Sequence, residues 1–176
     1  MKKIIALFML VMMVGALVAG CGGNDAKKED ASKKKIVVGL DDNFPPMGFK
    51  DENDKIVGFD IDLANEAAKR LGREVEFKPI DWSSKEAELS SGRIDVLWNG
   101  LNITEKRKEN MLFSEPYMEC KQLIFVPKGS PIQGEADLKG KVIGMQSAST
   151  AEENFEADKN LQASIKEVKK YPDCIA

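Results

Sequence analysis

The chain of 176 residues contains no histidine. Histidine is the usual general base near neutral pH and a common ligand of zinc, so its absence argues against a zinc enzyme or a Ser/His/Asp hydrolase. The chain also lacks a basic excess, because 26 Lys and Arg are mixed with 29 Asp and Glu. We therefore expect no nucleic-acid partner.

Cysteine is scarce, and three cysteines are too few for a disulfide framework. A composition of 43% hydrophobic and 31% charged residues instead predicts a packed core, and the length alone predicts about one domain. The glycine spacings match neither a Walker loop nor a dinucleotide fingerprint, and no paired-acid or Cys/His site stands out. No cofactor and no metal site is predicted.

The N-terminus has the features of a bacterial export signal. Lys2 and Lys3 precede an apolar run over residues 4–18, and small residues lead to Cys21. The run is shorter than the about 20 residues of a membrane-spanning helix, although a retained anchor is the alternative. The residues Leu-Val-Ala-Gly-Cys that end at Cys21 resemble a lipobox. The resemblance implies a signal peptide over residues 1–20 and an extracytoplasmic protein held at the cell membrane by a lipid on Cys21, with inner or outer membrane left open.

Residues 21–35 contain no large apolar side chain, so they predict a flexible tether after the lipidated cysteine. The remaining cysteines are Cys120 and Cys174. Outside the cytoplasm they can form a disulfide, or each can be buried as a free thiol.

Alternating strand and helix signals follow the tether, which predicts an α/β fold. The expected elements in chain order are a strand over 35–40, a turn at 51–54, a helix over 60–71, a strand over 74–80, a short helix from Ser83 or Ser84 through Leu89, a strand over 94–98, a helix over 104–110, a long strand over 121–126, a turn or short helix over 136–140, a strand over 141–145, a helix over 150–158 and a strand over 165–171. An extended strand that joins two α/β units predicts two lobes with a cleft, one over 36–126 and one over 127–176.

Ligands in open α/β sheets bind beyond the carboxyl ends of the strands, so the residues after each predicted strand are the candidates for a site. Arg107 follows a glycine turn and the predicted helix start at Thr104, and a guanidinium can grip a carboxylate with two hydrogen bonds. A small anion such as an α-carboxylate would suit this segment. A plain helix cap with a solvent-facing arginine is the alternative.

Aromatic and polar residues follow the other predicted strands. Phe44 and Trp82 are predicted to sandwich a ligand side chain, with core packing as the alternative. Asp41 and Asp42 can receive an ammonium group or simply form a turn. The polar loop over 147–150 can add donors from the second lobe.

Several stretches together resemble the bacterial family 3 extracellular solute-binding proteins, the amino-acid receptors of ABC importers. They lie at residues 57–64, 91–95, 101–107, 113–117 and 138–144, in the order of the family. The resemblance implies a type II periplasmic-binding-protein fold, the Venus flytrap, in which two α/β lobes close over a free polar amino acid for delivery to an ABC permease. It implies a binding protein without enzymatic activity, and a monomer is expected.

By position, the resemblance assigns a ligand contact to nine residues: Asp41, Phe44, Trp82, Asn99, Gly100, Asn102, Arg107, Ser149 and Thr150. Trp82 with Phe44 suits a cationic ligand side chain, whereas the two asparagines suit a neutral one, so the amino acid stays open. In the family, the acid that receives the ligand ammonium lies beyond position 176. The chain is therefore expected to stop inside the second lobe and, in this form, to bind weakly or not at all.

Two other functions remain as alternatives. A few proteins of this fold are dehydratases of cyclic carboxylic acids, which need an acid or base placed in the cleft. The same fold can also be the ligand-sensing module of a larger receptor. The N-terminal lipobox favours a receptor that stands alone.

Overall fold

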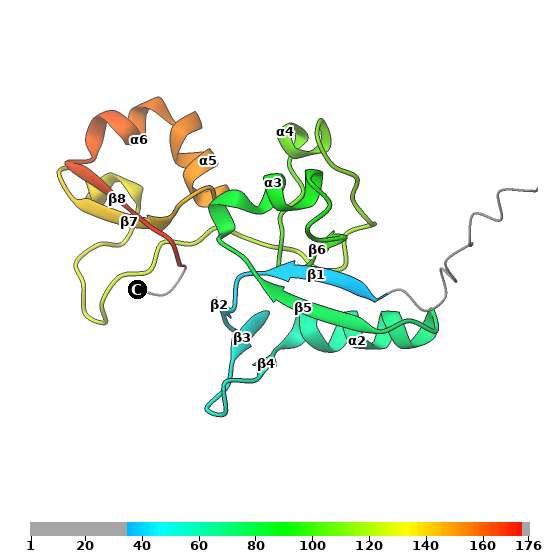
Figure 1. Ribbon diagram of the computed structural model, residues 1–176. Coiled ribbons are helices and arrows are strands. Elements are labelled where there is room, and N and C mark those ends of the chain that lie inside the picture. The colour runs from blue at the N-terminus through cyan, green and yellow to red at the C-terminus, as the bar shows by residue number, and fades with distance from the viewer. Residues whose placement is uncertain (1–34, 174–176) are drawn as a thin grey trace, which may run out of the picture. The chain divides into compact units, whose positions relative to one another are not determined.

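The computed structural model describes residues 35–173, and Figure 1 shows its helices and strands. A parallel sheet contains β1 (Ile36–Leu40), β5 (Val75–Pro79) and β6 (Val96–Leu97), in the order β5-β1-β6. The β-branched run of β1 places Val38 and Leu40 in the core. This sheet carries the first group of predicted site residues at the carboxyl ends of its strands.

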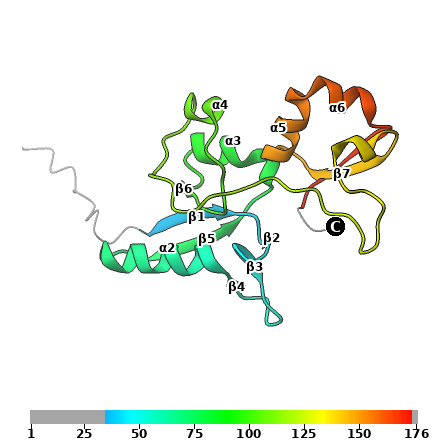
Figure 2. The same ribbon diagram turned by 180° about the vertical axis from the view of Figure 1, so that it is seen from behind.

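Helices lie on both faces of this sheet. The helix α2 (Phe59–Arg70) buries Ile61, Ala64 and Ala68 along one face, as its apolar spacing predicts. The helix α3 (Lys85–Ser90) lies on the opposite face, as Figures 1 and 2 show. A strand, helix, strand unit with a parallel sheet is therefore confirmed for this part of the chain.

A small antiparallel sheet follows β1 and was not predicted. It contains β2 (Asn43–Phe44), β3 (Gly48–Lys50) and β4 (Ile56–Val57). These strands are too short to show an alternating pattern in the sequence. The turn expected at 51–54 is confirmed and joins β3 to β4.

The later part of the described chain has its own parallel pair of strands, β7 (Val142–Gln146) and β8 (Glu167–Tyr171). A short 3₁₀ helix, η2 (Glu135–Leu138), precedes β7. The helices α5 (Thr150–Ala157) and α6 (Lys159–Ser164) connect the two strands. The strands and α5 were predicted, whereas α6 was not. The lobe boundary between 126 and 127 stays a prediction.

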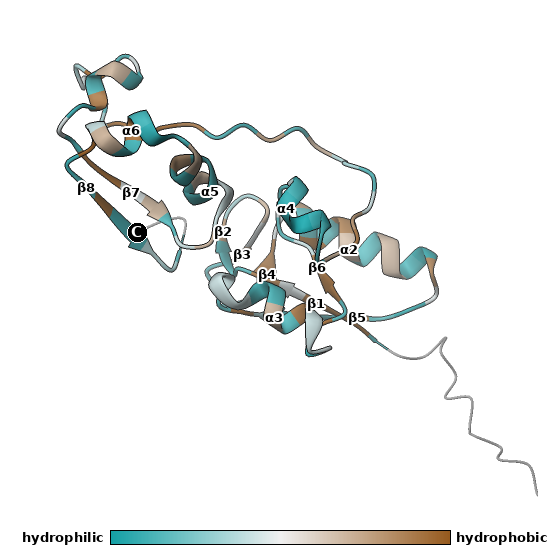
Figure 3. Ribbon diagram, turned by 90° about the horizontal axis from the view of Figure 1, so that it is seen from above, coloured by the Kyte–Doolittle hydropathy of each residue, from teal (hydrophilic) through white to brown (hydrophobic). Residues whose placement is uncertain are grey.

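Three sequence-based expectations need correction. The long strand over 121–126 is wrong, because the segment is extended and Leu123 and Phe125 are 69% and 89% exposed. A strand needs a neighbour for its backbone groups, and within residues 35–173 no strand pairs with this segment. Figure 3 shows its hydrophobic stretch running outside the sheets.

The other corrections concern helix starts and lengths. The helix expected from Ser83 or Ser84 begins as a 3₁₀ turn, η1 (Trp82–Ser84), and Asp81 is its cap because its carboxylate accepts from the Ser83 amide. The helix expected over 104–110 is only α4 (Glu105–Lys108). Its predicted cap is right, since the Thr104 hydroxyl accepts from the Arg107 amide at 3.3 Å.

The predicted signal peptide over 1–20, the lipidation at Cys21 and nearly all of the tether lie outside the described residues, and so does Cys174. Cys120 is described, and it is exposed. Within residues 35–173, no helix is both long and apolar enough to cross a membrane.

Candidate functional site

Arg107 is a buried charged group of the candidate site, with only 2% of its surface exposed. Its Nη1 donates to the Asn102 carbonyl oxygen at 3.0 Å and to the Thr150 hydroxyl at 3.2 Å. Its Nη2 donates to Glu153 Oε1 at 2.8 Å and to the Ala148 carbonyl oxygen at 3.5 Å. The guanidinium thus joins the loop after β6 to the start of α5.

Local structure explains why Arg107 reaches this position. Thr104 caps α4, so the helix starts just before the arginine and turns its side chain away from solvent. A buried guanidinium needs acceptors for its N–H groups. The Nε of Arg107 has no hydrogen-bond partner among the described residues.

The loop that follows β7 supplies acceptors to two cations. Ala148 has a positive φ of 54°, and its carbonyl oxygen accepts from Lys85 Nζ at 2.8 Å as well as from Arg107. The Ala148 amide donates to Glu152 Oε2. Ser149 then caps α5, because its hydroxyl accepts from the Glu152 amide at 3.2 Å. The predicted residues Ser149 and Thr150 therefore lie at a helix start beside Arg107.

Lys85 was not among the predicted residues. It is 2% exposed, and its Nζ donates to the Trp82 carbonyl oxygen at 3.3 Å and lies 5.2 Å from the centre of the Trp82 ring. Burial lowers the pKa of the Lys85 ammonium, and the nearby positive charge of Arg107 lowers it further. Lysine is seldom fully buried, so the sequence offered no signal for this residue beyond its place one turn after Trp82.

Asp41 is buried directly after β1, where the sequence predicted an acidic site residue. One carboxylate oxygen accepts from Gln146 Nε2 at 2.7 Å, and the other accepts from the Asn43 amide at 2.9 Å. Burial raises the pKa of the Asp41 carboxyl above its usual value. The neighbouring Asp42 forms an ion pair with Lys50 at 3.4 Å.

Asn99 and Gly100 follow β6 and are held by groups from other elements. Asn99 is buried, its Oδ1 accepts from the Asp41 amide at 3.3 Å, and its Nδ2 has no hydrogen-bond partner among the described residues. Gly100 has a φ of 58°, a conformation that favours glycine. Its amide donates to Asp60 Oδ2 at 2.6 Å.

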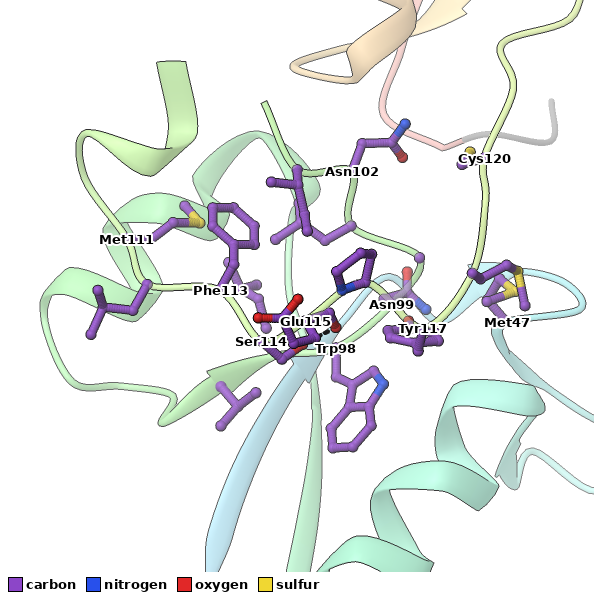
Figure 4. A pocket seen from close by; sticks show the side chains of 18 of the residues that line it. Met47, Trp98, Asn99, Asn102, Met111, Phe113, Ser114, Glu115, Tyr117 and Cys120 are labelled. Carbon is purple, nitrogen blue, oxygen red and sulfur yellow. Dashed lines mark hydrogen bonds between the residues drawn. The ribbon is translucent and has the colours of Figure 1, made fainter. Parts of the chain in front are cut away.

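A cavity of about 780 Å³ lies beside β6. Its lining is mainly apolar and includes Met111, Phe113 and Met47 (Figure 4). Four predicted residues line it: Phe44, Asn99, Gly100 and Asn102. The remaining predicted residues, Asp41, Trp82, Arg107, Ser149 and Thr150, do not.

The structure therefore places only one of the two predicted aromatic walls on this cavity. Phe44 lies on the cavity and close to Gly100, since a Cβ on that glycine would lie 2.9 Å from the Phe44 ring. Trp82 is buried, and its ring lies under the Lys85 ammonium. Among the residues that the structure describes, no group of His, Cys, Asp or Glu side chains is placed to hold a metal ion.

Comparison with known proteins shows which family the chain belongs to. A sequence model of the bacterial extracellular solute-binding proteins, family 3, matches residues 36–172. The chain belongs to this family. Both the predicted family and the predicted fold class are therefore confirmed.

The relatives of this family 3 protein are named as amino-acid-binding proteins. The arginine-binding extracellular protein ArtP of Bacillus subtilis is 37% identical over 153 residues, which cover 87% of this chain and 59% of ArtP. An ancestral arginine-binding protein, solved with arginine, is 48% identical with a TM-score of 0.74 over 79% of this chain and 61% of that one.

A substrate-binding protein of an ABC uptake transporter from Streptococcus pneumoniae, solved with bound histidine, is 39% identical with a TM-score of 0.76. The match covers 80% of this chain and 58% of that one. The family 3 chain described here thus spans about three-fifths of the length of these relatives.

Proposed function

We propose that the protein is a substrate-binding lipoprotein that captures a free polar amino acid and delivers it to an ABC importer. The names of its relatives support the ligand class, since they bind arginine, histidine or cystine. The permease partner is part of the proposal, and it is supported by a related solved protein that is a component of an ABC uptake transporter.

The observation that carries the proposal is the buried guanidinium of Arg107. It lies beside the Thr150 hydroxyl at the start of α5, and its Nε is buried without a partner among residues 35–173. A positive, desolvated group with an unused donor favours an anion, and a ligand carboxylate matches the geometry of a guanidinium. We assign the α-carboxylate of the amino acid to this place.

The other predicted residues receive roles around this contact. Asn102 and Thr150 position the guanidinium through the hydrogen bonds that they accept, and Ser149 holds the start of α5. Asp41, Asn99 and Gly100 supply polar groups on the side of β1 and β6, and Phe44 and Trp82 supply apolar surface. The ligand class is a polar amino acid, including cationic ones.

We propose that this site binds its ligand without converting it. The chain has no histidine, and both oxygens of Asp41 already accept hydrogen bonds from Gln146 and Asn43. A dehydratase would need a carboxyl group free to exchange a proton with its substrate. Release of product from a prephenate-like acid would contradict the proposal.

The remaining proposals concern organisation and location. We propose a signal peptide over 1–20, a lipid on Cys21, a tether through residue 35, and lobes over 36–126 and 127–176 of a monomeric receptor. Metabolic labelling with a fatty-acid analogue tests the lipid. Incorporation should be lost in Cys21→Ser and retained in Cys120→Ser.

Isothermal titration calorimetry tests the binding function. The full-length protein, with its second lobe completed, is titrated with the twenty amino acids, cystine and ornithine, and we expect at least one to bind. Arg107→Ala should weaken that binding at least about 100-fold, because it removes charge-assisted hydrogen bonds in a buried site. Lys106→Ala, an exposed position on the same helix, is the control and should bind like the wild type. Absence of binding to every compound, or full affinity in Arg107→Ala, contradicts the proposal.

A further inference from the structure

The donors of Arg107 are used unequally. A guanidinium has five N–H groups, and the two on Nη1 reach the Asn102 carbonyl oxygen and the Thr150 hydroxyl. The two on Nη2 reach Glu153 and the Ala148 carbonyl oxygen. The fifth, on Nε, is buried and has no partner among the described residues. Of the two neighbouring donor atoms Nε and Nη2, only Nη2 therefore makes hydrogen bonds among the described residues.

That edge has the shape of a carboxylate site. The N–H groups of Nε and Nη2 are parallel, and a carboxylate can accept from both at once. In the structure, Nη2 contacts a single carboxylate oxygen, Oε1 of Glu153, at 2.8 Å. A ligand carboxylate that takes both donors would gain the hydrogen bond that Glu153 leaves unmade at Nε.

The two members of this ion pair differ in their freedom to move. Arg107 is 2% exposed, whereas the Glu153 side chain is 25% exposed. Glu153 lies near the start of α5, one turn after Thr150, and its carboxylate accepts a hydrogen bond from Arg107 Nη2. Rotation of the Glu153 side chain toward solvent would free Nη2 without moving the helix.

We infer that Glu153 is a resident carboxylate that neutralises Arg107 in the ligand-free protein and that the ligand carboxylate displaces. This inference rests on the proposed amino-acid binding and names a residue that sets its affinity. Breaking the ion pair between Arg107 and Glu153 makes the free energy of ligand binding less favourable. Glu153 therefore holds the dissociation constant above the value that the rest of the site would give.

Charge makes the role of Glu153 distinct from a purely structural one. Lys85 and Arg107 are two buried cations that share the Ala148 carbonyl oxygen, and Glu153 is the carboxylate in contact with Arg107. Removing that carboxylate leaves the buried Arg107 guanidinium without its ion-pair partner in the free protein, which destabilises it. A bound ligand carboxylate restores the balance. The free protein should thus lose stability while the affinity for the ligand rises.

The test compares Glu153→Gln and Glu153→Ala with the wild type in the full-length protein, with its second lobe completed. L-Arginine, L-histidine and L-cystine are titrated by calorimetry, and the thermal midpoint is measured without ligand. We expect the dissociation constant of the best ligand to fall about tenfold in both variants and the ligand-free midpoint to fall as well. Glu156→Gln makes the same charge change on the exposed side of α5 and should leave the affinity unchanged.

The outcomes separate this inference from the proposed function. Binding by the wild type, with equal or weaker binding by Glu153→Gln and Glu153→Ala, overturns the role of Glu153 and leaves the proposed function intact. Equal tightening in Glu156→Gln also overturns it, because the effect would then come from net charge. If the wild type binds none of the twenty amino acids, cystine or ornithine, the proposed function fails and the inference fails with it.

Discussion

The ammonium group of Lys85 lies 2.8 Å from the carbonyl oxygen of Ala148, although 63 positions separate the two residues. The contact joins the start of α3 to the loop after β7. Arg107 donates to the same carbonyl oxygen, so two buried cations meet at one peptide group. A peptide in the left-handed conformation at Ala148 directs this oxygen toward both of them. The first prediction follows from this relationship.

The stability of the protein should depend on pH through Lys85. Burial lowers the pKa of its ammonium from the ordinary value of 10.5. Between the lowered pKa and 10.5, the unfolded chain binds more protons than the folded chain, so the free energy of unfolding rises with pH in this window. Urea unfolding at increasing pH should show this rise in the wild type and a smaller one in Lys85→Met. Lys69→Met, at an exposed position of α2, should keep the wild-type slope, and equal slopes in all three proteins would contradict the prediction.

Tyr117→Phe should destabilise the protein by about 1–3 kcal/mol, because it removes a donor to a buried carboxylate. The Tyr117 hydroxyl donates to Asp60 Oδ1 at 2.8 Å, and Asp60 is 1% exposed. The phenylalanine ring can keep the contact with Trp98, whose ring centre lies 6.4 Å away. Urea unfolding at neutral pH measures the loss. Tyr171→Phe is the matched control and should change the free energy of unfolding by less than about 0.5 kcal/mol.

The loss of stability in Tyr117→Phe should depend on pH. Burial raises the pKa of Asp60 above its ordinary value of 3.8, while the hydrogen bonds from Tyr117 and Gly100 lower it. The folded chain therefore holds this proton more tightly than the unfolded chain, so the contribution of Asp60 to stability falls as pH rises through the raised pKa. Without Tyr117 the pKa rises further and the fall is larger. The difference between wild type and Tyr117→Phe should shrink near pH 3.8, and a constant difference would show that Asp60 is not the group affected.

Gly48→Ala should disturb Asn99. A Cβ at Gly48 would lie 2.6 Å from Asn99 Nδ2 and 3.0 Å from Leu40 Cδ1. Both neighbours are buried, so the added methyl should cost about 1–3 kcal/mol of stability. Gly134→Ala is the control, since a Cβ there meets nothing within 4 Å and the backbone is extended with a φ of −163°. Thermal unfolding of both variants checks the prediction, and similar midpoints would contradict it.

Ser149→Ala should weaken the start of α5 by about 1 kcal/mol. The Ser149 hydroxyl accepts from the Glu152 amide and donates to the Gln146 carbonyl oxygen at 2.8 Å. Ser149→Asn keeps a side-chain oxygen that can accept at this cap and should retain most of the stability. Chemical denaturation measures both variants. An equal loss in both would indicate that the bond to Gln146 matters more than the cap.

Several local patterns in the sequence were sufficient to predict the helix or strand that they form. β-Branched residues predicted β1, one apolar face predicted α2, and Thr104 was correctly chosen as the cap of α4. The apolar segment over 121–126 was predicted as a strand for the same reason and is extended coil instead. A strand depends on a hydrogen-bonding neighbour, and its own residues cannot specify whether that neighbour is present.

The candidate site divides in the same way. Motifs in the sequence pointed to Asn99 after a predicted strand and to Arg107 and Thr150 in the first turns of predicted helices. Lys85 and Glu153 carried no such signal, because a lysine and a glutamate on short helices are ordinarily exposed. Their places beside Ala148 and Arg107 come from contacts between elements 46 or more positions apart.

The sequence by itself determined the family, the order of most strands and helices, and the residue types available to hold a carboxylate, because these depend on local periodicity, capping and short motifs. Only the tertiary structure decided which charges are buried together. The ion pair of Arg107 with Glu153 joins α4 to α5, and the hydrogen bond from Gln146 to Asp41 joins the end of β7 to the end of β1. Burial in that arrangement determines the electrostatic environment of each group, and no single segment of the chain encodes it.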